Sequence, residues 1–296
     1  MRHSRSQEFD DALGRAHFGA ARRWTDVASD PNAAEALAHR AATLRAAWRP
    51  PISDRVRFLE ERCRGRRVLD VGCVAHEISR IDSSQWLHGR LASVADRCTG
   101  VDVLPEGVAE MRKRGFEAVV HDLRNGLGPL VSSAPFDVIV AGELIEHVEH
   151  IDMLFRTAAE GLTPGGELIV TTPNPYAPRR VRAARLGIVW ENVDHILYAF
   201  PSGMAELAER HGLVLAEAAV TDDQKKLGLV DWVKEVQRRL RGRHYVTVGY
   251  ATVGAPRVRR VSVGSVRNAL RSLTSSRRGF LGETFIYVVR SEALQS

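Results

Sequence analysis

The sequence has few cysteines, no long apolar run and no Gly-x-Gly-x-x-Gly motif. Its three cysteines are an odd number without metal-ligand or disulfide spacing, so we read them as reduced thiols. No run of about 18 apolar residues occurs, and residues 1–14 lack the apolar core of a signal peptide. These absences predict a cytoplasmic protein without a membrane span. The missing glycine motif also argues against a nicotinamide dehydrogenase.

Basic residues are concentrated toward the end of the chain. The whole sequence has a formal net charge of +6, but residues 221–281 contain 14 Lys or Arg against 4 Asp or Glu. Such a segment can meet phosphates, an anionic surface or an acidic partner, and a solvated arginine-rich face is the plainer alternative. The segment lacks the interleaved aromatic side chains and the modules typical of RNA-binding proteins. RNA is therefore the less favoured partner.

Strand-like and helix-like stretches alternate from residue 66 onward, which predicts a Rossmann-like α/β fold with a mostly parallel sheet and crossover helices. The predicted strands are 68–71, 98–103, 118–121, 138–141, 167–172, 212–219 and 283–290. The predicted helices are 32–48, 54–63 capped by Ser53, 85–96 capped by Ser83 or Ser84, 107–114, 150–162, 202–211 and one around 229–240. We divide the chain into an N-terminal helical extension (1–64), a core (65–220), a basic insertion (221–281) and a last strand with a tail (282–296).

Acidic residues follow three predicted strands at one edge of the sheet. Asp70 and Gly72 end the first strand, Asp102 lies at the tip of the second, and Asp122 with Leu123 closes the third. Open α/β sheets bind ligands at the carboxyl ends of their strands. A carboxylate at the second tip can accept hydrogen bonds from both hydroxyls of a ribose, and the pair at the third suits an adenine. Together the three positions favour a ligand at this edge.

These residues belong to stretches that resemble the class I S-adenosylmethionine-dependent methyltransferases. The matching stretches, in the order of the family, are VLDVGC, GVDV, HDL, FDVIVAGELIEHV and LTPGGELIVTTPN. The resemblance covers residues 66–219 and implies a seven-stranded sheet with helices on both faces, an antiparallel last strand and S-adenosyl-L-methionine as cofactor. It assigns cofactor contacts to Asp70 and Gly72 near the methionine part, to Asp102 near the ribose, and to Asp122 and Leu123 near the adenine. Cys73, Val103 and Glu143 are further candidate cofactor-binding residues.

The loop after the first strand departs from the family pattern. Where the family usually has glycines, this chain has Val74 and His76. A glycine there permits positive φ and close approach of the backbone, so Val74 predicts a different path for the loop. We expect a longer loop over residues 72–84 that folds over the cofactor, with Trp86 or His88 as its wall. A non-catalytic S-adenosylmethionine-binding protein is the alternative if the loop has lost its ligand.

Two carboxylates and a histidine follow the fourth strand. If a helical turn begins near Glu143, then Glu143, Glu146 and His147 share one face, because positions i, i+3 and i+4 are neighbours on a helix. Such a cluster suits a divalent metal or a general base. A structural role is the third alternative, since acids are favoured at the start of a helix.

A second resemblance concerns this cluster. Small-RNA 3′-terminal 2′-O-methyltransferases have a similar Glu-x-x-Glu-His followed by another histidine, and these four residues hold Mg²⁺; ubiquinone-pathway O-methyltransferases have a similar Glu-x-x-Glu-His. His195 lies in the matching region here. The resemblance implies a site for Mg²⁺ or another divalent metal at Glu143, Glu146, His147 and His195, the last three also being candidate catalytic residues. We predict O-methylation of a small molecule or a glycan, with a terminal ribose of RNA as the alternative acceptor. The oligomeric state stays open.

Residues 174–192 connect the fifth strand to the next helix, and in this fold that connection commonly lines the acceptor pocket. Aromatic and basic side chains here are candidates for stacking on a sugar or base and for meeting phosphate or carboxylate groups. They are Tyr176, Trp190, Arg179, Arg180 and Arg182. A surface helix with an arginine-rich outer face is the alternative.

Overall fold

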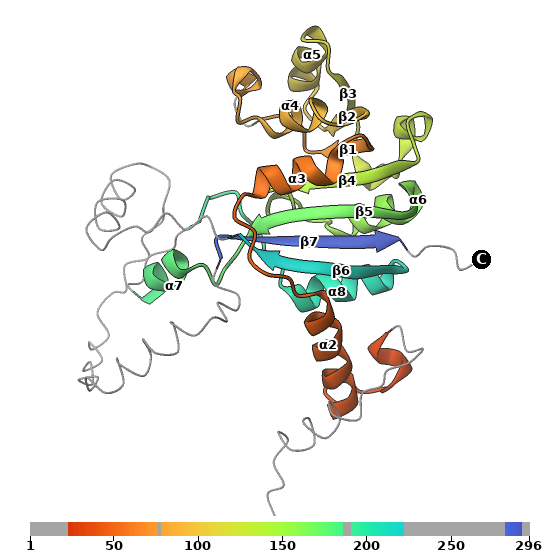
Figure 1. The fold of residues 1–296 in the computed structure, drawn as a ribbon, viewed down its shortest axis with the longest axis vertical. Coiled ribbons are helices and arrows are strands. Elements are labelled where there is room, and N and C mark those ends of the chain that lie inside the picture. Colours follow the sequence, from red (N-terminus) through yellow and green to blue (C-terminus); the bar gives the residue numbers. More distant parts are fainter. Residues whose placement is uncertain (1–22, 76–77, 186–190, 222–281, 292–296) are drawn as a thin grey trace, which may run out of the picture.

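A seven-stranded sheet forms the centre of the protein (Figure 1). The computed structural model describes residues 23–75, 78–185, 191–221 and 282–291. The strand order is β3-β2-β1-β4-β5-β7-β6, and β7 runs antiparallel to both of its neighbours. The strands are β1 (Arg67–Val71), β2 (Arg97–Asp102), β3 (Glu117–Val120), β4 (Phe136–Gly142), β5 (Leu162–Pro173), β6 (Leu213–Val220) and β7 (Thr284–Ser291). The order and the directions confirm the predicted Rossmann-like fold with an antiparallel last strand.

Helices connect these strands and precede them. The α-helices are α2 (Ala34–Ala47), α3 (Arg55–Cys63), α4 (Leu87–Ala92), α5 (Pro105–Lys113), α6 (Asp152–Gly161), α7 (Pro178–Arg185) and α8 (Pro201–Arg210). Short 3-10 helices are η1 (Trp24–Asp26), η2 (Ile78–Asp82), η3 (Leu123–Asn125), η4 (Gly128–Ser132) and η5 (Ile145–His147). The predicted helix around 229–240 and the basic insertion lie outside the described residues, so the insertion stays a prediction. In the described part of the chain, no helix is long and apolar enough to cross a membrane.

Both faces of the sheet are buried, because successive residues of a strand point to opposite sides. Leu69, Ile139 and Leu168 belong to a core cluster that includes α6 and α8. Their neighbours Val68 and Val138 belong to a second cluster on the other face, with α3 and α4. Helices therefore cover both faces, as the sequence predicted.

The N-terminal helices are attached to the edge of the sheet at β6. The chain between α2 and α3 runs parallel to β6, where the Arg49 backbone N–H donates to the Ala218 carbonyl at 2.8 Å and that of Ile52 to Val220 at 2.9 Å. The side chain of Asp54, not the predicted Ser53, caps α3 by accepting from the Arg57 backbone N–H at 3.0 Å. This connection places the start of α3 beside the carboxyl ends of the central strands.

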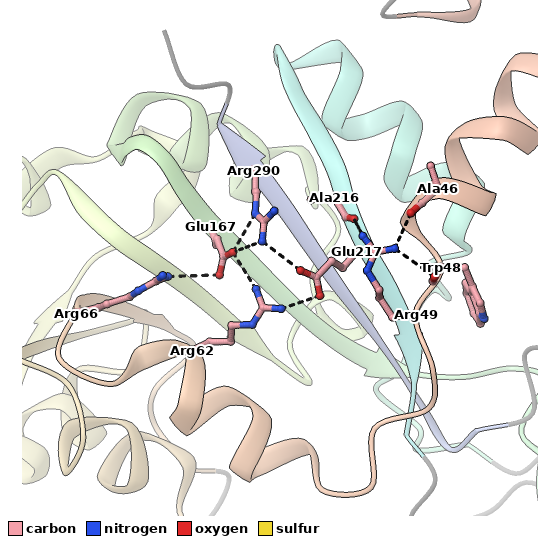
Figure 2. A network of polar contacts seen from close by, with 9 residues as sticks. All are labelled: Ala46, Trp48, Arg49, Arg62, Arg66, Glu167, Ala216, Glu217 and Arg290. Carbon is pink, nitrogen blue, oxygen red and sulfur yellow. Dashed lines mark hydrogen bonds and ion pairs between the residues drawn. The ribbon is translucent and has the colours of Figure 1, made fainter. Parts of the chain in front are cut away.

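A network of ion pairs joins α3 to the last three strands (Figure 2). Glu167 of β5 accepts from Arg62 of α3 at 2.9 Å and from Arg290 of β7 at 2.7 Å, and both arginines also reach Glu217 of β6. Burial raises the pKa of Glu167, but the contacts with Arg290 and Arg62 outweigh it and hold the pKa below its usual value. The charged network thus stabilises the packing of α3 on the sheet.

Candidate active site

A cavity of about 720 Å³ opens at the carboxyl ends of the central strands. This volume is within the range of pockets that hold small ligands and cofactors. Residues predicted to bind the cofactor line it together with His147, and these are Asp70, Gly72, Cys73, Asp102, Val103 and Glu143. Residues Gly72 to Ala75, Trp86 and His88 also line this cavity. That the loop folds over the cofactor stays a prediction.

Gly72 allows the chain to turn at the tip of β1. It has φ 73°, and a Cβ on it would lie 2.8 Å from Cδ1 of Leu144. Its backbone N–H donates to the Val101 carbonyl at 2.9 Å. Only glycine adopts this conformation without strain, so Gly72 fixes where the loop leaves the strand.

The carboxylate of Asp102 is held by the backbone at the tip of β2. It accepts from the Val74 N–H at 3.0 Å and from the Leu104 N–H at 3.1 Å. Burial raises the pKa of Asp102 against the opposing effect of these hydrogen bonds. Because a carboxylate has about four acceptor positions, Asp102 retains capacity to accept from a ligand hydroxyl beside its backbone donors.

Val74 occupies its position without strain on the backbone. Among the described residues, Glu143 is the one non-glycine residue with positive φ, so Val74 does not need the conformation that glycine permits. Its side chain packs on α5, where a Cβ on Gly107 would lie 2.3 Å from Cγ1 of Val74. A glycine on the facing helix thus makes room for the valine in the loop.

The rest of this loop leads into α4, which begins later than predicted. Its first residue is Leu87 and its N-cap is Trp86, which makes no side-chain capping bond. The Ser83 hydroxyl instead accepts from the Gln85 backbone N–H at 3.1 Å, so it shapes the turn before the helix. Trp86 donates from Nε1 to the Cys73 carbonyl at 3.0 Å and holds the loop against the start of α4.

A buried contact between a carboxylate and a histidine was missed by the sequence analysis. Oδ2 of Asp70 lies 3.0 Å from Nδ1 of His88, and both side chains are almost fully buried. The contact fixes the carboxylate at the end of β1 from the side of α4. Eighteen residues separate the two partners, and no sequence pattern links a helical histidine to a strand-end acid.

Asp122 and Leu123 lie at the end of β3, outside the residues that line the cavity. The Asp122 side chain caps η3 by accepting from the Arg124 N–H at 2.9 Å, and it also pairs with the Arg124 guanidinium. Leu123 is buried in the main core. Their assignment to an adenine stays a prediction.

The Glu-x-x-Glu-His motif does not form the predicted α-helical turn. Glu143 has φ 55° and lies outside a helix, and residues Ile145–His147 form η5. Its Oε1 atom is buried, lies 3.6 Å from Arg55 Nη1 and has no hydrogen-bond partner. A non-glycine residue at positive φ is strained, and such strain is found most often at functional sites.

Glu146 and His147, the last two residues of the motif, lie close to His195. Glu146, His147 and His195 each offer a ligand atom, and these atoms lie within 4.8 Å of one another. The Glu146 carboxylate accepts from the Thr172 hydroxyl at 3.0 Å. Burial, and after it the charge of Glu143, raise the pKa of Glu146 to about 7. Three of the four predicted metal ligands therefore converge, and Glu143 lies beside them on the cavity side.

Acidic residues accompany both histidines. Nδ1 of His195 lies 3.0 Å from Oε2 of Glu191, and Nδ1 of His147 lies 3.1 Å from Oδ2 of Asp194. The two imidazole rings are in edge contact, with centroids 4.8 Å apart. The Ile196 backbone N–H donates to the Glu146 carbonyl at 2.8 Å and attaches this segment to η5.

Arg55 is a further residue of the cavity that the sequence analysis missed. It begins α3, donates from Nη1 to the Thr171 hydroxyl at 3.0 Å and lines the same wall as Gly72 and Glu143. Its side chain is 25% exposed. An arginine in the cavity lining is suited to a ligand carboxylate.

The arginines predicted on the acceptor side are paired with acids. Arg179 contacts Glu283 at 2.6 Å and Arg180 contacts Glu191 at 2.5 Å. Tyr176 is partly exposed and in ring contact with Phe200. The side chain of Arg182 and residue Trp190 lie outside what the structure describes.

The chain matches the family model described as a methyltransferase domain over residues 38–218. This match covers more than half of the sequence, and the chain belongs to this family of S-adenosylmethionine-dependent methyltransferases.

Individual relatives are more distant. A ubiquinone biosynthesis O-methyltransferase from Azorhizobium caulinodans is 32% identical over 143 residues, which are 47% of this chain and 51% of that protein. A protein from Mycolicibacterium smegmatis, named a probable S-adenosylmethionine-dependent methyltransferase, is 32% identical over 182 residues, or 55% and 66% of the two chains. The chain thus spans about half to two thirds of the length of these relatives. A solved methyltransferase from Archaeoglobus fulgidus aligns with 15% identity, covering 80% of this chain and 91% of its own, with a TM-score of 0.47.

Proposed function

We propose that the protein is an O-methyltransferase that moves the methyl group of S-adenosylmethionine to a hydroxyl of a small molecule or a glycan, with the help of a divalent metal. The observation that supports this most is the position of the Glu146, His147 and His195 cluster. His147 and Glu143 line the same cavity as Asp102, so the cluster lies next to the proposed site of the methyl donor.

In this proposal the cofactor lies along the carboxyl ends of β1, β2 and β4. Asp102 accepts from the ribose hydroxyls, and the loop at Gly72 approaches the methionine part. The carboxylate of that methionine pairs with Arg55, whose guanidinium already contacts Thr171 and Glu143 at this end of the cavity. The methyl group then faces Glu143 and His147.

The cluster offers the kinds of donor atom that a divalent metal binds. Carboxylate and imidazole ligands suit Mg²⁺, Mn²⁺ and Zn²⁺, and the buried Oε1 of Glu143 has no hydrogen-bond partner of its own. A metal bound here would lower the pKa of an acceptor hydroxyl and orient it. Glu146, fixed by the Thr172 hydroxyl, and the two histidines would hold it at the cavity wall.

The same side chains support a second mechanism, because each histidine has a carboxylate at Nδ1. A carboxylate there holds the ring in the tautomer whose other nitrogen accepts a proton. In this alternative, His147 takes the proton of the acceptor hydroxyl. The oxygen then bonds to the methyl carbon while the carbon–sulfur bond breaks.

Methyl transfer from labelled S-adenosylmethionine to catechol, a simple vicinal diol, separates the mechanisms. We expect EDTA to abolish transfer, Mg²⁺ or Mn²⁺ to restore it, and Glu146→Gln to lose it. The matched control Glu106→Gln, an exposed acid in the first turn of α5, should retain full activity. If the wild type still transfers the methyl group in the presence of EDTA and His147→Ala does not, the metal mechanism is contradicted and His147 as general base is favoured. An RNA oligonucleotide in the same assay tests the alternative acceptor.

A further inference from the structure

Two acidic residues precede His195 in the sequence, and each contacts a different histidine of the cluster. Glu191 lies 3.0 Å from Nδ1 of His195, and Asp194 lies 3.1 Å from Nδ1 of His147. One short segment thus supplies a candidate ligand and a carboxylate partner for both imidazole rings. The sequence analysis did not single out either acid.

The two acids differ in how firmly they are held. Glu191 is 17% exposed and also contacts the Arg180 guanidinium of α7 at 2.5 Å, while Arg180 donates to the Asn174 carbonyl at 3.3 Å. Asp194 is 51% exposed. A chain of contacts therefore extends from the end of β5 through Arg180 and Glu191 to His195, whereas Asp194 meets His147 from the solvent side.

A carboxylate at one nitrogen of a histidine affects the other nitrogen. It accepts the ring N–H, fixes the tautomer and the ring orientation, and makes the free nitrogen a stronger ligand. Removing such a partner commonly weakens metal binding about 10- to 100-fold. This effect is expected for both rings here, because each has a carboxylate at Nδ1, at 3.0 Å for His195 and 3.1 Å for His147. Nε2 of His195 also lies 3.3 Å from Nδ2 of Asn192.

We infer that Glu191 and Asp194 are positioning residues that orient His195 and His147 toward a divalent metal. The inference rests on the metal site of the proposed function. Glu191 has the larger effect, because Arg180 holds its carboxylate and burial shields the contact. Asp194 has the smaller one, because solvent competes for its carboxylate.

The test is titration of the full-length protein with Mn²⁺ by calorimetry. Glu191→Gln should weaken Mn²⁺ binding about 10- to 100-fold and Asp194→Asn to a lesser extent, near the lower limit of that range. Asp194→Glu, which keeps the carboxylate, should recover most of the loss. Glu283→Gln is the matched control, since Glu283 pairs with Arg179, the neighbour of Arg180 on α7; its Mn²⁺ affinity should equal that of the wild type.

A second readout separates orientation of the rings from general damage. Pulsed electron paramagnetic resonance of the Mn²⁺ complex should detect nitrogen coupling from two histidines in the wild type and altered coupling in Glu191→Gln. The affinity for S-adenosylhomocysteine and the melting temperature should stay close to wild type. Equal Mn²⁺ affinity in the wild type and in Glu191→Gln would overturn the inference alone. A wild type that binds no Mn²⁺ would overturn both the inference and the metal of the proposed function.

Discussion

Replacing Arg55 by glutamine tests how the cofactor lies in the cavity. The proposed orientation pairs its guanidinium with the carboxylate of the methionine part, at the end of the cavity lined by Gly72 and Glu143. S-adenosylhomocysteine has this carboxylate, whereas 5′-methylthioadenosine lacks the whole amino-acid part. Arg55→Gln should therefore weaken binding of the first ligand and leave the affinity for the second unchanged.

The magnitude follows from the exposure of the side chain. A hydrogen bond to a charged group contributes about 1.5–3 kcal/mol, and the 25% exposure of Arg55 places it in the lower part of that range. Since every 1.4 kcal/mol is a tenfold change in affinity, about 1.5–2 kcal/mol corresponds to a loss of about 10- to 30-fold.

Isothermal calorimetry with both ligands measures the difference directly. The control is Arg57→Gln, on the same helix, because Arg57 is 74% exposed and pairs with Glu61 away from the cavity. Its affinity for both ligands should match the wild type. The orientation is refuted if Arg55→Gln binds S-adenosylhomocysteine as tightly as the wild type, or if both ligands lose affinity to the same extent.

Two further predictions concern the ribose and the stability of the fold. Asp102→Ala should weaken S-adenosylhomocysteine about 100-fold, as loss of about 3 kcal/mol of charge-assisted hydrogen bonding requires, while the circular dichroism spectrum stays unchanged; unaltered affinity in calorimetry would exclude the ribose contact. Glu167→Gln should lower the free energy of unfolding at pH 7 by about 2 kcal/mol. This is less than the cost of breaking a fully buried ion pair, because solvent partly screens the exposed arginine partners. Because the folded pKa of Glu167 lies below its usual value, this contribution is complete above the unfolded pKa and disappears as the pH falls through the folded pKa. Urea unfolding from pH 7 to pH 3 should thus show the difference between wild type and variant shrinking with acid, and a constant difference would contradict the assigned pKa direction.

Much of the sheet could be predicted because its signal is local. Each buried strand is a short apolar run bounded by breakers, so all seven predicted strands coincide with observed strands within a few residues. Once the strands are placed, the positions of the acids at their carboxyl ends can be read directly from the sequence. Helix starts were less predictable: α3 is capped by Asp54 and not by the predicted Ser53, and α4 begins only at Leu87.

The cavity depends on partners that are distant in sequence. Val74 is compatible with the loop because Gly107, on another helix, leaves space for it, and the buried pair of Asp70 with His88 joins a strand to a later helix. Arg55 reaches the cavity because the chain before α3 is attached to β6. None of these contacts has a local sequence signal, so only the folded arrangement reveals them.

The reaction side shows the limit of a spacing argument. Positions i, i+3 and i+4 would share one face of an α-helix, but Glu143 has positive φ and η5 begins only at Ile145. Glu146 and His147 nonetheless meet His195, since the Ile196 N–H is bound to the Glu146 carbonyl. The tertiary contact, and not the helical turn, brings the candidate ligands together.

The central claim is that a metal site lies directly beside the methyl group of the cofactor. It can be tested by nuclear magnetic resonance of S-adenosylmethionine labelled with ¹³C at the methyl carbon and bound to the protein. Paramagnetic Mn²⁺ should strongly broaden the methyl signal relative to diamagnetic Mg²⁺, and Glu146→Gln should abolish the broadening. A methyl signal of the same width with Mn²⁺ and Mg²⁺ at saturating concentrations would contradict the account.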